Sequence, residues 1–518
     1  MNRNLQVLLG SLLLTLNFVG CSPSHDSSSP SSPLDVGDVP VDSLLVRQYC
    51  GSCHMVPDPK LLDKYRWEAF VLPRMGYMLG VYPDDSTRNS LFEDNLGGDR
   101  VKAAQVFPEM PVITPGDWEK IQKFYLSQAP DTILPPDKLA IQTPVPGFTP
   151  RIPRQRLSPP STTLAHFTRA GWYIGDAHTE KVYTFLSIGT PATVVPGMEG
   201  AVNLIESRSD VFITYMGSFS PTDNNSGALI RYPRDDGSPS ILIQDLQRPV
   251  HTAAADLNGD QRTDFVICEF AKWTGGLSWW RQEADGNFTR QLLKQVPGAT
   301  RTVVKDFTGD GLPDILALFA QGDEGISLFK HTGNNAFEEE RILRFPPSYG
   351  SSFFDVVDWD EDGDWDIIYT NGDNADYPPF TKPYHGIRLF ENLGDSAFTE
   401  KWFLHLPGAY KVIPGDFDGD QDLDLAAISF FPDYERQPEA GFVYFQNQGE
   451  DDFSPFTFEE STSGRWLVMD AGDPDFDGDT DLLLGSLAFE VIPKGNWVTN
   501  WTQRGIPFIF LANRSKEP

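Results

Sequence analysis

The chain has few cysteines, no long hydrophobic run and a shortage of positive charge. Among 518 residues there are four Cys, and 41 Lys and Arg stand against 73 Asp and Glu, a net charge of −32. This excess of negative charge argues against nucleic-acid binding. The apolar run at residues 5–18 is too short for a comfortable transmembrane helix. A phosphate-binding loop, a nucleophile elbow and an HExxH zinc motif are all missing, so the sequence carries no signature of those enzyme classes.

Two of the cysteines stand in Cys50-Gly51-Ser52-Cys53-His54, which has the C-x-x-C-H spacing of c-type haem attachment. The two thiols can add to the two vinyl groups of one haem, and His54 then reaches the iron as proximal ligand. The chain has no second Cys pair to complete a zinc cage, so haem is favoured over zinc or a disulfide. The motif predicts one covalent haem c and an exported protein.

The N-terminal sequence predicts a signal peptide and the compartment of the exported protein. Residues 5–18 follow Arg3 and have the length of a signal h-region, and the small residue Gly20 precedes Cys21. This arrangement resembles a bacterial lipoprotein signal, with residues 1–21 as signal peptide and Cys21 as the lipidated residue. The Ser/Pro-rich residues 22–42 suit a flexible tether. We expect a lipid anchor in the cell envelope of a Gram-negative-type bacterium, in the outer membrane and on its periplasmic or cell-surface side. An ordinary secretory signal is the alternative.

Residues 43–130, which contain the C-x-x-C-H motif, resemble a small class I-type cytochrome c domain. Helical apolar spacing predicts helices over residues 61–79 and 117–126, the second one after a cap region at residues 114–116. The resemblance implies a Met as sixth iron ligand and electron transfer as the role of the domain. Met75 is preferred for this ligand and Met110 is the alternative. The Pro-rich residues 131–160 predict a semi-rigid linker.

The second half of the chain repeats an acidic loop about every fifty residues. Each copy has Asp, Asn or Thr oxygens at relative positions 1, 3, 5 and 9. The candidate metal ligands are Asp256, Asn258, Asp260 and Asp264; Asp306, Thr308, Asp310 and Asp314; Asp358, Asp360, Asp362 and Asp366; Asp416, Asp418, Asp420 and Asp424; and Asp473, Asp475, Asp477 and Asp481. A repeat of this length favours propeller blades.

Carboxylates at alternate positions of a tight turn can converge on one hard cation, and Ca²⁺ takes six to eight oxygens at flexible angles. Glycines in the five loops, at positions 259, 309, 363, 419 and 478, permit the sharp turn. The flanks have strand character, so these are predicted strand–loop–strand sites for up to five Ca²⁺ ions. Their expected role is to rigidify the blades.

A second strand-like segment recurs after each loop, for example at residues 326–329, 387–392, 442–447 and 508–513. Together the segments resemble FG-GAP/VCBS repeats, a family of calcium-binding β-propeller blades. Two further blades without acidic loops, around residues 171–185 and 201–213, bring the expected number to seven. The predicted fold is therefore a small all-α cytochrome c-like domain followed by an all-β propeller over residues 161–518.

Two features of the propeller are candidates for function. Five residues before the acidic loops stand His251, Arg301 and Lys411 in three blades, either to line a central channel or to compensate nearby carboxylates. The excursion at residues 371–386 contains Lys382, Tyr384 and His385, and an ordinary surface loop is the favoured interpretation of it. His251, Lys382, Tyr384 and His385 are the weak catalytic candidates.

The leading functional hypothesis is an envelope-anchored c-type cytochrome lipoprotein that passes electrons to or from a periplasmic redox partner, with the propeller as platform for a substrate or partner. The first alternative is a surface module whose propeller binds a glycan or protein, with haem as sensor. A weaker alternative is a polysaccharide-active enzyme. Whether the protein is an enzyme is left open, because a propeller fold alone does not define a function.

Overall fold

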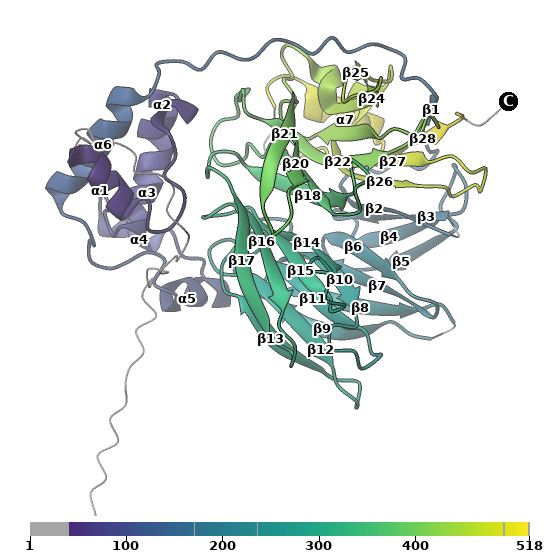
Figure 1. The fold of residues 1–518 in the computed structure, drawn as a ribbon, viewed down its shortest axis with the longest axis horizontal. Helices are drawn as coiled ribbons and strands as arrows, with labels where there is room; N and C mark the ends of the chain where they lie inside the picture. Colours follow the sequence, from purple (N-terminus) through teal and green to yellow (C-terminus); the bar gives the residue numbers. More distant parts are fainter. Residues whose placement is uncertain (1–40, 170, 236, 490–492, 516–518) are drawn as a thin grey trace, which may run out of the picture.

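The structure is a computed structural model that describes residues 41–515, apart from residues 170, 236 and 490–492. It contains a helical domain and a β-propeller, which lie side by side (Figure 1). The predicted signal peptide with Cys21, and the predicted tether as far as residue 40, lie outside the described residues. Among the described residues no helix is long and apolar enough to cross a membrane.

Residues 41–130 form helices and connecting turns. The elements are α1 Val41–Tyr49, η1 Pro59–Leu61, α2 Lys64–Arg66, η2 Trp67–Val71, α3 Leu72–Met78, α4 Asp85–Asn89, α5 Leu96–Ala103 and α6 Pro115–Gln128. α2, η2 and α3 follow one another directly and match the helix predicted over residues 61–79. α6 matches the helix predicted over residues 117–126, and its cap is Thr114, whose hydroxyl accepts a hydrogen bond from the Asp117 N–H at 3.1 Å.

The helical domain has its own hydrophobic core. Trp118, Ile121 and Tyr125 are spaced three and four residues apart, so they lie on one face of α6 and point into this core. Tyr125 packs on Trp67 of η2, with 4.3 Å between the ring centres. The indole N–H of Trp67 donates to the Pro59 carbonyl at 2.8 Å, so this buried polar group is satisfied.

Seven four-stranded antiparallel sheets form the propeller. Blade one has β2 Thr162–Thr168, β3 Gly171–Asp176, β4 Lys181–Phe185 and β5 Thr193–Pro196; blade two has β6 Ala201–Glu206, β7 Asp210–Tyr215, β8 Gly227–Pro233 and β9 Ser240–Leu246; blade three has β10 Pro249–Ala255, β11 Asp264–Glu269, β12 Gly276–Gln282 and β13 Phe288–Lys294; blade four has β14 Ala299–Lys305, β15 Asp314–Phe319, β16 Gly325–His331 and β17 Phe337–Arg344.

The remaining three blades follow the same order. Blade five has β18 Ser351–Val357, β19 Asp366–Asn371, β20 Gly386–Asn392 and β21 Phe398–His405; blade six has β22 Ala409–Gly415, β23 Asp424–Ser429, β24 Phe442–Asn447 and β25 Phe453–Phe456; blade seven has β26 Trp466–Gly472, β27 Asp481–Ser486, β28 Phe508–Asn513 and β1 Phe148–Arg151. Short helices η3 Pro438–Gly441, η4 Ser461–Ser463 and α7 Trp497–Arg504 lie in connections. The predicted number of seven blades is confirmed.

The second strand of the last five blades is buried along its whole length. In β11, β15, β19, β23 and β27 all six residues are buried, because each strand has neighbours in its own sheet and a blade on either face. Their near-continuous apolar sequences reflect this double burial. Cys268 lies in β11 with its side chain fully buried, and burial raises the pKa of its thiol, as expected of an inert core cysteine.

The propeller begins earlier in the chain than predicted. β1 pairs with β28 from Phe148↔Asn513 to Arg151↔Phe510, so a strand from the N-terminal side of the propeller completes blade seven and closes the ring. Before it, the Gln142 N–H donates to the Pro455 carbonyl at 2.9 Å. The prediction of a linker over residues 131–160 is therefore wrong for its second half. Proline richness is compatible with an edge strand, because an edge strand needs only one side of its backbone paired.

The two ends of the strands carry different connections. The acidic loops join the first strand of a blade to the second. The loops that join the second strand to the third lie at the opposite end. The helical domain contacts two of these loops: the Arg100 guanidinium donates to the Asp223 carbonyl between β7 and β8, and the Tyr384 hydroxyl, between β19 and β20, donates to the Leu61 carbonyl. The acidic loops therefore lie on the propeller face that is turned away from the helical domain.

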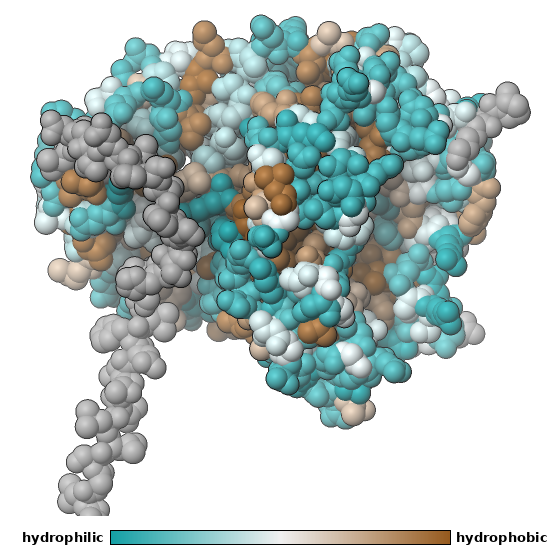
Figure 2. Space-filling model, in the orientation of Figure 1, coloured by the Kyte–Doolittle hydropathy of each residue, from teal (hydrophilic) through white to brown (hydrophobic). Residues whose placement is uncertain are grey.

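The surface on the side shown in Figure 2 is mostly hydrophilic, and hydrophobic residues occur there as separate small patches. This agrees with a chain in which acidic residues greatly outnumber basic ones.

Closure of the ring by β1 can be tested with Phe148→Ala. Phe148 packs on Tyr444 and Phe417, with ring centres 5.6 and 5.9 Å away, so truncation leaves a cavity where β1 joins the core. We expect a loss of about 3 kcal/mol in the free energy of unfolding, measured by chemical denaturation. Thr149→Ala, at an exposed position of the same strand, should lose less than about 0.5 kcal/mol. Equal losses would contradict the closing role of the Phe148 side chain.

Candidate functional site

Three of the five acidic loops bring carboxylates together at positions 1, 3 and 5. In blades five, six and seven these oxygens lie within 4.8 Å of one another: Asp358, Asp360 and Asp362; Asp416, Asp418 and Asp420; and Asp473, Asp475 and Asp477. The loops turn at glycines in the left-handed region, for example Gly363 at φ 95° and Gly419 at φ 83°. Such oxygen triads can hold a hard divalent cation.

The ninth-position aspartate has a different role from the first three. Its side chain is buried in all five loops, and one carboxylate oxygen accepts a backbone N–H from the third strand of the blade at 2.8 Å. The pairs are Asp264 with Gln282, Asp314 with His331, Asp366 with Asn392, Asp424 with Asn447, and Asp481 with Asn513. This residue was predicted as a metal ligand, and the structure shows that it ties the loop to the sheet.

A further acidic position escaped the sequence analysis. Blades five and six carry Asp364 and Asp422 at relative position 7, and blade seven also has an acid there. Burial, and then the charge of Asp362, raises the pKa of Asp364 to about 6; burial, and then Asp420, does the same for Asp422. The recurrence at this position was visible in the sequence. In both loops the neighbouring carboxylates therefore add to the effect of burial.

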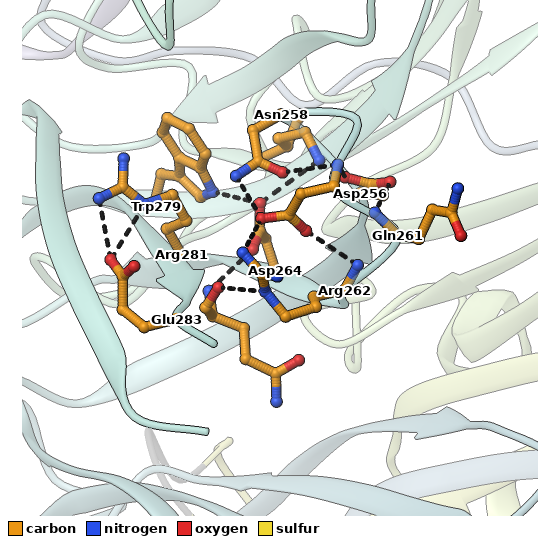
Figure 3. Close-up of polar contacts among 11 residues, drawn as sticks. Asp256, Asn258, Gln261, Arg262, Asp264, Trp279, Arg281 and Glu283 are labelled. Carbon is orange, nitrogen blue, oxygen red and sulfur yellow. Dashed lines mark hydrogen bonds and ion pairs between the residues drawn. The ribbon is translucent and has the colours of Figure 1, made fainter. Parts of the chain in front are cut away.

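The loop of blade three is compensated from within the protein (Figure 3). Asn258 replaces the second carboxylate, and Arg262 stands at relative position 7. Burial by itself would raise the pKa of Asp260. Hydrogen bonds from Arg262 and Asn258 and the charges of Arg262 and Arg281 outweigh this effect and lower it. In blade four, Thr308 leaves only Asp306 and Asp310 among positions 1, 3 and 5.

The C-x-x-C-H motif follows α1 directly. Cys50 packs against the core of the helical domain, and burial raises the pKa of its thiol to about 11, with the neighbouring Tyr125 hydroxyl opposing this shift. Cys53 is exposed. His54 Nδ1 lies 2.8 Å from the Met55 carbonyl oxygen. Because a carbonyl only accepts, Nδ1 carries the proton and Nε2 of the neutral ring keeps a lone pair.

The two predicted sixth ligands lie in different surroundings. Met75 of α3 is half-buried and packs against the same core as Cys50, together with Val56 and Leu79. Met110 is 75% exposed. Of the two methionines, only Met75 therefore shares the apolar environment of Cys50.

The excursion between β19 and β20 is an interdomain contact. Tyr377 and Phe380 pack against the core of the helical domain, and the Arg66 guanidinium carbon lies 3.8 Å from the ring centre of Phe380. The Tyr384 hydroxyl donates to the Leu61 carbonyl at 2.9 Å. The interpretation as an ordinary surface loop is wrong, because its partly buried aromatic side chains pack against another domain.

A second contact joins the helical domain to blades two and three. Phe107 meets Trp273 edge to face with 5.2 Å between ring centres, and Arg100 reaches the Asp223 carbonyl at 3.2 Å. Gly97 lies so close to the β7–β8 loop that a Cβ there would stand 2.7 Å from the carbonyl carbon of Asp223. Two separate contacts across the face fix the orientation of the helical domain.

Beneath the excursion lies a buried group of ionisable residues. Lys382 and His385 are 2% and 1% exposed, and Lys382 Nζ donates to the Ser348 and Asp373 carbonyls at 3.1 and 3.3 Å. Burial lowers the pKa of Lys382 to about 8 and lowers that of His385 strongly. Burial raises the pKa of Glu324 to about 8, although it accepts hydrogen bonds from Ser351. Of the catalytic candidates in this loop, Tyr384 contacts the helical domain, and Lys382 is held by carbonyls of the propeller itself.

The channel candidates lie on the innermost strands. Arg301 of β14 pairs with Asp355 of β18 at 2.7 Å, and Lys411 of β22 donates to the Met469 carbonyl of β26 at 2.6 Å. Burial, and then the charges of Arg301 and Lys411, lowers the pKa of His251 on β10. Their partners are on neighbouring inner strands and not in the acidic loops, which supports the channel interpretation.

A family model described as an FG-GAP-like repeat matches residues 256–317 and 306–369. Residues 256–369 are therefore similar to FG-GAP-like repeats. The matched segments include the acidic loops of blades three, four and five; those of blades six and seven have the same spacing beyond the match. No curated protein matches the chain.

Solved structures with a similar fold are distant in sequence. Saccharomyces cerevisiae Sqt1 is 9% identical over 69% of this chain and 98% of its own, at a TM-score of 0.43. BBS1N, from a complex with ARL6DN, is 10% identical over 71% and 97%, at 0.42. A Lactobacillus plantarum protein is 13% identical over 58% and 85%, at 0.38.

The buried carboxyl of Glu324 predicts a pH dependence of stability. Its pKa rises from 4.5 to about 8 on folding, so the folded protein keeps a proton that the unfolded chain releases above about pH 4.5. Stability contributed by this group is therefore lost as the pH rises from about 5 to 8. Glu324→Gln should remove this loss and raise the free energy of unfolding at pH 8 by on the order of 3 kcal/mol relative to wild type. Denaturation at pH 5 and pH 8 checks this, and an equal pH slope in both proteins would contradict it.

Proposed function

We propose that the protein is a c-type haem protein of the cell envelope, in which the helical domain carries one covalent haem for electron transfer and the FG-GAP-like propeller is a rigid binding platform for a redox partner or substrate. The observation that carries this proposal is the geometry of Cys50, Cys53 and His54. The tautomer of His54 leaves Nε2 free as an iron ligand, and its Nδ1–H is held by a backbone carbonyl as in many metal-ligating histidines.

The residues around the motif fit this group. Cys50 shares its hydrophobic cluster with half-buried Val56, Met75 and Leu79, whose remaining exposed apolar surface suits a flat apolar macrocycle. Cys53 is exposed and accessible to attachment. Bound haem supplies a one-electron couple, and a Met/His ligand pair gives it a relatively high potential. In this proposal the two thiols and the side chains of His54 and Met75 would hold the group, and the apolar side chains would exclude water from it.

The acidic triads of the propeller support a second element, Ca²⁺ as stabilising ion. Their oxygens are hard ligands, and the neighbouring acids add to burial in raising the pKa of Asp364 and Asp422, an effect that a bound cation would relieve. Since these loops face away from the helical domain, the metal rigidifies blades and does not take part in haem chemistry.

The docking of the helical domain favours electron transfer over an independent glycan-binding module. Contacts to blade five and to blades two and three hold the helical domain in one place over the propeller face. A partner that binds this face next to the helical domain is then held at a defined distance from the haem. A lipid anchor at Cys21 would keep the assembly at the membrane.

The proposal is tested by producing the chain with cytochrome c maturation proteins and recording reduced-minus-oxidised absorption spectra. We expect one covalent haem per chain with a low-spin spectrum and reversible one-electron cycling. Cys50→Ala/Cys53→Ala should abolish covalent attachment. Absence of covalent haem from the wild-type protein, or a redox-inert haem together with tight glycan binding, would remove the electron-transfer role.

The sixth ligand is tested with a pair of methionine variants. Met75→Ala should convert the low-spin spectrum to a high-spin one, because the ligand on one side of the iron is lost. Met110→Ala is the matched control and should leave the spectrum unchanged, since Met110 is 75% exposed. The opposite pattern would assign Met110 as ligand.

A further inference from the structure

A pocket of about 310 Å³ lies between blades two and three. Its walls come from the end of β6, from β7, from the end of β10 and from the connection that follows β10. These segments lie at the end of the blades that is turned away from the helical domain. The volume is at the lower end of the range of ligand pockets, so the pocket suits a small molecule or one unit of a polymer.

The pocket arises because two neighbouring connections differ in length. In blade two, residues 207–209 join β6 to β7, whereas in blade three residues 256–263 join β10 to β11. The longer loop therefore has no counterpart beside it on blade two. The inner strand of blade three also ends in Ala254 and Ala255, whose small side chains leave the space between the two blades unfilled.

One side of the pocket is apolar. Ile205 and Phe212 of blade two line it together with the two alanines of β10. Both larger side chains are only partly buried, and Phe212 packs against Phe265, with 5.4 Å between the ring centres. Because the face of an aromatic ring is negatively polarised, a fixed ring beside small apolar side chains suits the C–H groups of a ligand.

The other side of the pocket is polar, and its charges are paired within the protein. Glu206 pairs with the Arg234 guanidinium, and the Arg262 guanidinium pairs with Asp260. The two oxygens of Asp256 accept backbone N–H groups at 3.0 and 2.7 Å. An ionic ligand would therefore find no unpaired counter-charge among these residues. A ligand hydroxyl can still form a charge-assisted hydrogen bond with such carboxylates.

Neutral hydrogen-bonding groups complete the polar side. Ser207, Gln261 and Thr263 line the pocket and are exposed. Gln261 has a φ of 68°, and its side chain points away from the Asp264 carboxylate (Figure 3). Hydroxyl and amide groups can both donate and accept hydrogen bonds, so they suit a ligand that carries several hydroxyl groups.

We propose that this pocket binds one residue of a neutral saccharide. A sugar ring has an apolar C–H face and hydroxyl groups around its edge, which correspond to the two sides of the pocket. An acidic sugar is disfavoured, because Glu206 and Asp256 line the pocket and the chain has a net charge of −32. This inference goes beyond the proposed electron-transfer role. A saccharide in this pocket and a redox partner on the opposite face can be bound at the same time.

The test is titration of the full-length protein with glucose, galactose, mannose, N-acetylglucosamine and glucuronic acid, followed by saturation-transfer-difference NMR and isothermal calorimetry. We expect saturable binding of at least one neutral sugar and no binding of glucuronic acid. Ala254→Trp fills the pocket and should abolish binding. Ala284→Trp is the matched control, because Ala284 lies in an exposed turn of the same blade outside the pocket, and it should leave the affinity unchanged.

A second variant tests the polar side of the pocket. Gln261→Gly removes the side-chain amide without straining the positive φ, and it should weaken sugar binding by about fivefold through the loss of a hydrogen bond. It also keeps the inference testable if Ala254→Trp does not fold, which near-ultraviolet circular dichroism of each variant reports.

The inference is overturned if no sugar of the panel binds saturably, if glucuronic acid binds as tightly as the neutral sugars, or if the two tryptophan variants behave alike. The haem spectrum of the same samples should be the same in all variants. It reports separately on the proposed electron-transfer role, so failure of that role and failure of the saccharide site are distinguishable.

Discussion

The propeller depends on a carboxylate buried at the ninth position of each acidic loop. Asp366 shows the principle: one oxygen accepts the N–H of Asn392 at the end of the third strand, and the other accepts the N–H of Trp359 within the loop. One side chain therefore fixes the loop to the sheet and fixes the turn itself. The same construction recurs in blades three to six, and in blade seven Asp481 makes the bond to the third strand, from the Asn513 N–H. A buried carboxylate is tolerated because backbone donors replace the water that it loses.

Because of this construction, the carboxylates of each loop lie close together, and their negative charge has to be neutralised. Fixing the loop by its ninth residue holds the carboxylates at positions 1, 3 and 5 close together, whether or not a counter-charge is present. In blade three the Arg262 guanidinium supplies the counter-charge. In blade four Thr308 stands in place of one carboxylate, so the loop has less negative charge to neutralise. Blades five to seven have neither device, so we place the metal there. Blade seven is also the blade that β1 closes, and blade five carries the excursion that holds the helical domain.

The sequence predicted the elements that a repeat or a local pattern encodes. The seven blades, the strand–loop–strand setting of the acidic loops and the two longest helical stretches follow from periodicity, and all are present in the structure. It did not predict β1, because a strand that pairs with residues more than three hundred positions away has no local signal beyond its own short length. It also missed the contact made by Tyr377 and Phe380, since aromatic residues in a loop do not reveal which surface they cover.

The site was predicted by residue type more accurately than by role. Position 9 was correctly singled out, yet its burial and backbone bonds depend on strand pairing that the spacing alone does not show. Position 7 was overlooked, although the sequence shows that the loop of blade three has Arg262 there and the loop of blade five has Asp364. The axial ligand was left between Met75 and Met110, because both follow the motif at plausible distances, and only the packing of the helical domain separates a half-buried side chain from an exposed one.

The most direct test of this account is hydrogen–deuterium exchange of the full-length protein with Ca²⁺ and after its removal. The account predicts faster exchange without Ca²⁺ in residues 358–366, 416–424 and 473–481 and in the strands beside them. Residues 256–264, held by Arg262, and the helical domain core should keep their protection. Equal loss of protection in residues 256–264, or no change in any loop, would contradict it.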